Sequence, residues 1–226
     1  MLPDKIGVID TETTGIDAKT CKIVEVALIT NTFVFAELID PGIPIPPETS
    51  AVHHICDTDV AGKRTWEQVL PELSGFINKN DLILVAHNAE YDKTVLGLAP
   101  EQVWICTYKC ALRQWPDAPS HKNEVLKYWL KLGTLGRAHM HAAHSAEHDC
   151  TTTGLILEEL LKYQTLDTLV QWSKEPKQFA KIAFGKHAGK KWSEIDSGYL
   201  MWMEKQKDMD PDIVECARRE LRSRRK

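Results

Sequence analysis

The sequence has no long apolar run, no closely paired cysteines and no internal repeat. Its longest apolar run, residues 82–86, is far shorter than the roughly 20 residues of a membrane-spanning helix, so we expect no membrane partner. No basic segment followed by an apolar one opens the chain, and we therefore expect no secretory signal. The six cysteines include no Cys-x-x-Cys pair and lie mostly in apolar segments, which indicates reduced thiols in a cytoplasmic protein.

Charge is unevenly distributed along the 226 residues. Residues 174–226 carry 14 Lys and Arg against 9 Asp and Glu, a net charge of +5, whereas residues 1–173 carry a net charge of −9. This asymmetry predicts an acidic catalytic domain over residues 1–173 and a small basic C-terminal module over residues 174–226 that binds nucleic acid. The alternative for the basic end is a solvated charged surface. We expect the boundary near residues 173–181.

The alternation of apolar and polar residues predicts an α/β fold with a mixed five-stranded sheet flanked by helices. The expected strands cover residues 5–10, 22–30, 33–40, 82–86 and 103–106. The expected helices cover residues 65–77, 109–115, 123–132, 146–163 and 166–174, with one more beginning at Glu90. The Pro-rich segment PGIPIPPETS, residues 41–50, cannot form a central strand.

Two carboxylates follow the first apolar strand in the run IGVIDTETTGID. Asp10 and Glu12 lie two residues apart, and side chains at that spacing project from the same face of a strand. Their repulsion calls for a positive partner, and a hard divalent cation with oxygen ligands is the usual one. The alternative is a strand that simply ends in a polar turn.

The second acidic motif, AHNAEYD, follows the strand at residues 82–86. We expect Asn88 to cap the next helix at its N-terminus. Asp92 shares a helix face with Val95 and Leu96, so it should point inward, toward the sheet. An Asp near a helix N-terminus is also favoured by the helix dipole, but that effect does not explain the inward direction.

The third motif, HSAEHD, places Asp149 in the first turn of a helix that Ser145 caps. Asp149 lies on the face of this helix that should be buried, and His144 precedes the helix. Four histidines crowd the region, so a zinc site is an open alternative: His139, His141, His144 and His148. The other acidic motifs favour a harder ion.

Together these motifs supply four carboxylates, from Asp10, Glu12, Asp92 and Asp149, and one imidazole, from His144. Four carboxylates can hold two divalent ions about 3.5–4 Å apart, the arrangement used for in-line displacement at phosphorus. A neutral His144 that titrates near neutrality can accept the proton of the attacking water.

The order DTETTG, AHNAEYD, HSAEHD resembles the three exonuclease motifs of the DEDDh superfamily. The segment IPPETSAVHHI, residues 45–55, is similar to the stretch that joins the first two motifs there. The resemblance covers residues 5–165 and implies a ribonuclease H-like fold with 3′→5′ exonuclease activity. One departure is Tyr91, where Phe is more usual, and we expect it to pack equivalently.

The resemblance also implies the roles of the five motif residues. Asp10, Glu12, Asp92 and Asp149 would bind two metal ions, Mg²⁺ or Mn²⁺, and His144 would be the general base. It further implies a set of substrate-binding residues near the terminal nucleotide, and the glycine among them would let the backbone approach closely. This set is Thr11, Thr13, Gly15, Ile16, His53, Ile55 and Asn88; each of them has packing as its alternative role.

The basic C-terminal segment also resembles part of a known subgroup. Residues 184–213 and 104–116 resemble the corresponding segments of the exodeoxyribonuclease X-like subgroup. In the module, residues 184–189 are expected to form a tight Gly-rich turn that exposes Lys186 and His187. A small core would come from Ile195, Tyr199, Leu200, Trp202 and Met203. Basic residues interleaved with aromatic ones are typical of nucleic-acid surfaces, although Trp192, Tyr199 and Trp202 could equally belong to the core.

We therefore predict a 3′→5′ exodeoxyribonuclease, dependent on Mg²⁺ or Mn²⁺, that releases 5′ mononucleotides from single-stranded or duplex DNA 3′ ends. An exoribonuclease is the nearest alternative, because DNA and RNA differ at the 2′-hydroxyl and no residue of the sequence decides between them. A nucleic-acid-binding protein without catalysis is a third possibility, against which the complete five-residue set argues.

Overall fold

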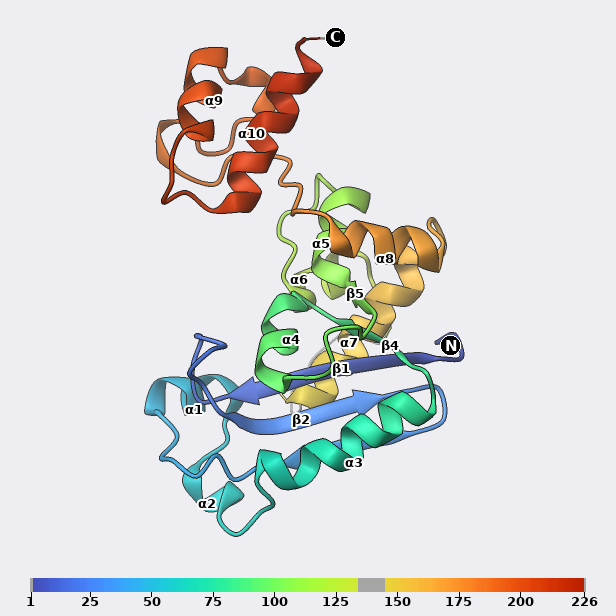
Figure 1. The fold of residues 1–226 in the computed structure, drawn as a ribbon. Coiled ribbons are helices and arrows are strands. Elements are labelled where there is room, and N and C mark those ends of the chain that lie inside the picture. Colours follow the sequence, from blue (N-terminus) through green and yellow to red (C-terminus); the bar gives the residue numbers. More distant parts are fainter. Residues whose placement is uncertain (1, 134–144, 226) are drawn as a thin grey trace.

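The computed structural model describes residues 2–133 and 145–225. A mixed five-stranded sheet lies between two layers of helices (Figure 1). Its strands stand in the order β3-β2-β1-β4-β5; β1, β2 and β3 are antiparallel neighbours, and β4 and β5 run parallel to β1. The strands are β1 (Ile6–Thr13), β2 (Ile23–Ile29), β3 (Val34–Leu38), β4 (Ile83–Ala86) and β5 (Trp104–Cys106). The predicted fold class is confirmed.

Each face of the sheet is covered by its own set of helices because strand side chains alternate between the faces. Ile9 packs with the layer formed by α3 (Trp66–Lys79) and α4 (Glu90–Leu96). Val8, its neighbour, packs with the opposite layer. That layer consists of α5 (Thr107–Gln114), α6 (Asn123–Trp129), α7 (Ala146–Leu160) and α8 (Leu166–Lys174).

Strand β1 is longer than predicted. It was expected to end at Asp10, but its ladder with β2 continues, and Glu12 pairs with Glu25 before a bulge at Thr13. Both carboxylates of the first motif therefore project from a paired strand in the middle of the sheet. The backbone pairing with β2 fixes their direction, since the ladder with β4 ends at Val8.

The entry into α4 also differs from expectation. Asn88 was predicted to cap this helix, but the N-cap position belongs to Ala89, which makes no side-chain cap bond. Asn88 instead has a φ of +68°, in the left-handed region that Asn tolerates better than most residues. It forms the sharp turn that leads from the end of β4 into α4.

Two short helices, α1 (Pro47–His53) and α2 (Asp57–Val60), follow β3 and were not anticipated. The Pro-rich segment contains no strand, as predicted, and Pro47 occupies the first turn of α1, where its missing N–H costs nothing. No helix in the described parts of the chain combines the length and apolarity needed to cross a membrane.

The C-terminal residues have a core of their own, built on η2 (Gly185–His187), η3 (Trp192–Glu194), α9 (Ser197–Glu204) and α10 (Pro211–Ser223). They stand beyond α8, away from the sheet (Figure 1). Trp192 is buried there, and its indole N–H donates to the Phe179 carbonyl at 2.6 Å. The buried cluster comprises Ile182, Trp192, Ile195, Leu200, Met203, Cys216, Ala217 and Leu221. The division at residues 173/174 stays a prediction.

Candidate active site

Three of the predicted metal ligands converge at the carboxyl end of β1. Carboxylate oxygens of Asp10, Glu12 and Asp149 lie within 4.8 Å of one another. Asp10 and Glu12 share the face of β1 on which α7 packs, and α7 carries Asp149. The spacing of two along a strand thus aims both carboxylates at one helix, as predicted.

The position of Asp149 follows from how α7 is held against the sheet. Ser145 caps the helix as expected, and its side chain accepts a hydrogen bond from the His148 backbone N–H at 3.3 Å. Glu25 on β2 accepts a second one from the Ala146 N–H at 2.8 Å. The buried Cys150 thiol bonds the Val8 carbonyl of β1 at 3.4 Å. These contacts place the first turn of α7 directly over β1.

Asp92 approaches the cluster from the other layer of helices. It lies on α4, is only 3% exposed and points inward, as predicted. The Thr11 hydroxyl, on the α4 side of β1, donates to the Asp92 carboxylate at 3.0 Å. Asp92 belongs to neither of the close ligand groups found among the described residues, but its charge raises the pKa of Asp10.

The electrostatics of the cluster are unfavourable without a cation. Burial, followed by repulsion from Asp92, Asp149 and Glu12, raises the pKa of Asp10 well above its usual range. Burial and the same kind of repulsion raise the pKa of Glu12 to about 8, and burial raises that of Asp92 to about 7 against the opposing Thr11 hydrogen bond.

The donor set fits a hard divalent cation. All three close ligands are carboxylates, the donors preferred by Mg²⁺ and Mn²⁺. A cation between them would turn the repulsion that raises these pKa values into attraction. The residues present therefore suit the metal that the sequence predicts.

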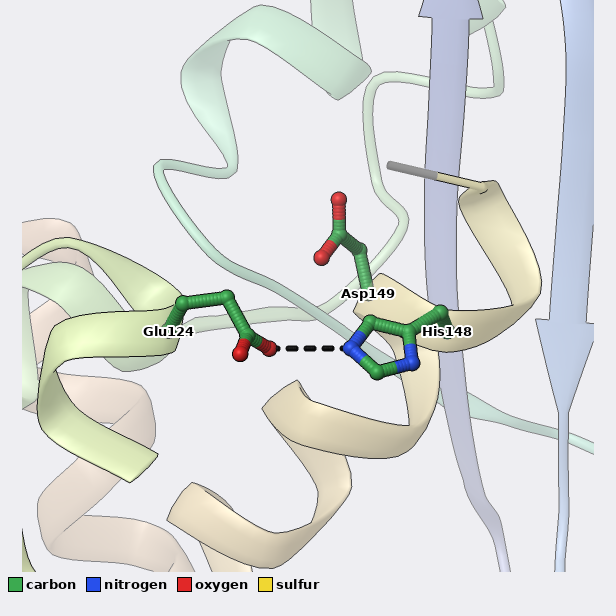
Figure 2. A group of neighbouring side chains, drawn as sticks. All are labelled: Glu124, His148 and Asp149. Carbon is green, nitrogen blue, oxygen red and sulfur yellow. Dashed lines mark hydrogen bonds and ion pairs between the residues drawn. The ribbon is translucent and has the colours of Figure 1, made fainter. Parts of the chain in front are cut away.

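The predicted general base, His144, falls outside the described residues, as do His139 and His141. Of the four histidines considered for zinc, His148 is described, and it lies on α7 facing Glu124 of α6 (Figure 2). Its Nε2 is 3.0 Å from a Glu124 carboxylate oxygen. Glu124, His148 and Asp149 form a second group with ligand atoms within 4.8 Å, and it includes one histidine of the zinc alternative.

Glu124 is itself held by several donors. Burial raises its pKa, but hydrogen bonds from His148, Thr152 and Lys127 outweigh burial, so that the pKa lies below its ordinary value. The Thr152 hydroxyl donates at 3.0 Å, and the Lys127 ammonium lies 3.3 Å away. This network locks α6 against α7 beside Asp149.

The end of β1 and the loop after it contain four of the predicted substrate-binding residues. Thr11 is engaged with Asp92, whereas the Thr13 hydroxyl donates to the Gly15 carbonyl at 2.8 Å. A Cβ at Gly15 would meet Cys21 only at an ordinary 3.8 Å, so no internal clash requires glycine there. Ile16 is 95% exposed, an unusual position for an isoleucine.

The remaining three predicted substrate-binding residues are in different environments. His53 is buried, and its Nδ1 accepts the Ile55 N–H at 3.1 Å. Burial lowers its pKa, and the nearby Thr13 backbone opposes this shift. His53 thus adjoins the loop after β1. Ile55 is buried in a small apolar cluster with Val24, Ile45 and Val60. Asn88 is exposed.

Two residues that shape the site were not recognised from the sequence. Glu25 anchors the start of α7, and burial raises its pKa against the opposing hydrogen bond from the Ala146 N–H. A signal was present, since Glu25 interrupts the apolar strand IVEVALI. Tyr91 was expected only to pack like Phe, but its hydroxyl donates to the Gly15 carbonyl at 2.6 Å and also contacts Thr13 and Cys21.

We expect Tyr91→Phe to lower the free energy of unfolding by about 1 kcal/mol, because it leaves the partly buried Gly15 carbonyl with one donor fewer. The Michaelis constant for substrate should rise as the loop loosens, while metal affinity stays unchanged. Urea denaturation and steady-state kinetics would measure these effects. Tyr163→Phe, at a 58% exposed position, is the control, and equal stability of the two variants would contradict the role of the Tyr91 hydroxyl.

Comparison with known families agrees with this geometry. The family model RNase_T, described as Exonuclease, matches residues 8–157. The chain belongs to this exonuclease family. The match spans β1, α4 and the first turns of α7, which carry the predicted ligands. The predicted enzyme class, a hydrolase acting as a 3′→5′ exonuclease, is confirmed.

Individual relatives extend the match beyond this family model. Exodeoxyribonuclease 10 of Escherichia coli (strain K12) is 33% identical over 214 residues, which cover 91% of this chain and 94% of the relative. The DNA polymerase III subunit epsilon of Treponema pallidum (strain Nichols) is 32% identical over 153 residues, covering 62% and 68%. The predicted resemblance to the exodeoxyribonuclease X-like subgroup is confirmed.

Solved structures show the same architecture. Exonuclease X in complex with 5′ overhanging duplex DNA superposes with a TM-score of 0.61 at 31% identity, covering 74% of this chain and 99% of that one. The nuclease domain of 3′hExo, a DEDDh family member bound to rAMP, gives a TM-score of 0.55 at 18% identity, covering 70% and 92%. At this lower identity the likeness shows the fold alone.

Proposed function

We propose that this exonuclease is a divalent-metal-dependent exodeoxyribonuclease that releases 5′ mononucleotides from DNA 3′ ends, single-stranded or duplex. The convergence of Asp10, Glu12 and Asp149 within 4.8 Å carries the proposal. A relative named exodeoxyribonuclease, similar over nearly the whole chain, supports DNA as the substrate. The solved structure of exonuclease X in complex with 5′ overhanging duplex DNA supports a duplex end as one form of it.

In the proposed mechanism, Asp10, Glu12, Asp92 and Asp149 hold two divalent cations, Mg²⁺ or Mn²⁺. Such cations lower the pKa of a bound water and stabilise the charge that develops on the leaving 3′ oxygen. His144 accepts the proton of the attacking water. The Thr11 hydroxyl keeps the Asp92 carboxylate oriented through its 3.0 Å hydrogen bond.

The loop after β1 would orient the terminal nucleotide. Tyr91 bonds the Gly15 carbonyl and contacts the Thr13 hydroxyl, and the exposed Ile16 side chain is available to pack against the last base. His53 would support the same loop from α1, and Asn88 would contact substrate from the turn before α4. Ile55, buried in its own cluster, would act through packing.

The test is digestion of 5′-labelled single-stranded DNA, duplex DNA and RNA of the same sequence, with Mg²⁺, Mn²⁺ or Zn²⁺ after EDTA treatment. We expect a descending ladder on DNA, complete loss of activity in EDTA, and recovery with Mg²⁺ or Mn²⁺. The protein carrying Asp149→Asn controls for contaminating nucleases. Faster digestion of RNA would establish the exoribonuclease alternative, and recovery with Zn²⁺ alone would establish the zinc alternative.

Two further proposals concern the whole chain. Residues 174–226 would form a separate nucleic-acid-binding module, which their net charge of +5 and their own apolar core support. A cytoplasmic location is supported by the cysteines, all six of which are free thiols and four of which are buried.

A further inference from the structure

One face of the C-terminal residues gathers aromatic rings and a lysine. Tyr199 and Trp202 lie three residues apart on α9, and their ring centroids are 5.1 Å apart. The His187 ring meets Tyr199 edge-on at 4.5 Å, and the Lys186 ammonium lies 5.2 Å from the centre of the Tyr199 ring. We call these four residues the aromatic–basic face.

The aromatic residues of this region have different roles, which the sequence could not distinguish. Trp192 is 8% exposed and belongs to the core. Trp202 is 48% exposed and lies outside the buried cluster. Tyr199 is surrounded by Lys186, His187 and Trp202, so it serves as their support. The ring of Trp202 is therefore the one that a ligand can reach.

The loop beside this face concentrates positive charge in a fixed shape. It has four lysines between residues 181 and 191 and no acidic residue. A bridge between Lys181 and Lys191 closes the loop, and Gly185 and Gly189 take the left-handed conformation that its tight path requires. In the described part of the module, the ion pairs involve Lys177, arginines on or next to α10, and Glu175 with Arg113, so these four lysines keep their charge available.

We propose that the aromatic–basic face binds single-stranded DNA, with a base stacked on Trp202 and phosphates contacted by Lys186 and the neighbouring lysines. An exposed ring stacks on any base, and lysines attract the backbone, so this combination suits a strand without sequence preference. The net charge of +5 over residues 174–226 is complementary to a polyanion.

The segment that joins α8 to the module is anchored to the catalytic domain. Arg113 on α5 donates to the Trp172 and Pro176 carbonyls at 2.8 and 2.9 Å and pairs with Glu175 at 3.0 Å. A strand held by the module is therefore kept near the catalytic domain, which raises the effective concentration of its 3′ end. This last step rests on the proposed function, whereas the binding itself does not.

The test measures binding and hydrolysis separately with the full chain. Fluorescence anisotropy with labelled oligo(dT) in EDTA reports binding without catalysis. Trp202→Ala should weaken binding about 5- to 150-fold, the usual effect of losing one stacked base, and Trp202→Phe should restore most of the loss. Lys186→Gln should reduce the salt slope by about 0.7, the value for one single-strand phosphate contact.

Matched controls are Trp129→Ala, at a tryptophan that is 42% exposed on α6, and Lys79→Gln on α3. Both should bind oligo(dT) like the wild type, and Trp202→Ala should hydrolyse a dinucleotide at the wild-type rate.

Unchanged binding by Trp202→Ala, or an equal loss in Trp129→Ala, would overturn the proposal. Loss of dinucleotide hydrolysis in Trp202→Ala would also overturn it, as the effect would then be structural. Binding through Trp202 by a chain that digests no DNA would support this site and reject the proposed function.

Discussion

Asp10→Asn should abolish exonuclease activity and, at the same time, make the metal-free protein more stable. Asp10 is one of three carboxylates whose oxygens lie within 4.8 Å of one another, and its replacement would remove a proposed metal ligand. Metal-bound charge contributes several kcal/mol to transition-state stabilisation, so the rate should fall at least about 10³-fold. Single-turnover digestion of 5′-labelled DNA with saturating Mn²⁺ would measure the loss.

The gain in stability follows from the pKa values. Burial and repulsion raise the pKa of Asp10 well above its usual range, that of Glu12 to about 8 and that of Asp92 to about 7. In the unfolded chain these groups titrate near pH 4. Between about pH 4 and pH 8 the folded, metal-free protein therefore holds more protons than the unfolded chain, and its free energy of unfolding falls as the pH rises.

Replacing Asp10 removes one charge from this repulsion, so the stability difference between variant and wild type should grow from pH 5 to pH 8. Urea denaturation in EDTA at several pH values would measure this stability difference. Added Mn²⁺ should stabilise the wild type far more than the variant. Asp117→Asn, the same change at an exposed carboxyl, should alter neither activity nor stability. A metal-free Asp10→Asn protein less stable than the wild type at pH 8 would contradict the electrostatic account.

Much of the fold was predictable because its signals are local. The strands show apolar runs bounded by turn residues, and α8 has the predicted bounds because the Thr165 hydroxyl caps it, accepting the Thr168 N–H at 3.2 Å. Helices α1 and α2 escaped prediction because they are too short to show a periodic pattern. The turn at Asn88 escaped it because an Asn favours both a helix cap and the left-handed conformation.

The residues of the candidate site also divide into those with local sequence signals and those without. Asp10, Glu12, Asp92 and Asp149 could be named because each belongs to a short motif whose local geometry aims it inward. Residues that act through partners far away in the sequence could not be named in this way. Glu25 bonds a backbone group 121 positions away, and the Tyr91 hydroxyl bonds one 76 positions away. Only the packing of α7 and α4 on β1 and β2 brings such pairs together, and no sequence pattern predicts these contacts.

His144→Ala should lower the turnover rate about 10²- to 10⁴-fold, the usual contribution of a general base, while leaving metal affinity nearly intact. This separates the proposed base from the ligands, because Glu12→Gln should lose both activity and Mn²⁺ binding. An ordinary histidine titrates near pH 6.5, so the wild-type rate should rise through that region at saturating metal. In His144→Ala this rise should disappear. Calorimetric titration of Mn²⁺ and rate measurements from pH 5 to 9 would test both statements.

His148→Gln is the matched control, since Gln can still hydrogen-bond Glu124 and the change removes the other imidazole of the same motif. We expect it to keep turnover within a few-fold of the wild type and to keep its dependence on pH. The two variants also separate the alternatives for the metal. If His144→Ala and His148→Gln both lost metal affinity, histidine would be a ligand at this site. The group of Glu124, His148 and Asp149 would then replace the carboxylate cluster on β1 and α7 as the metal centre.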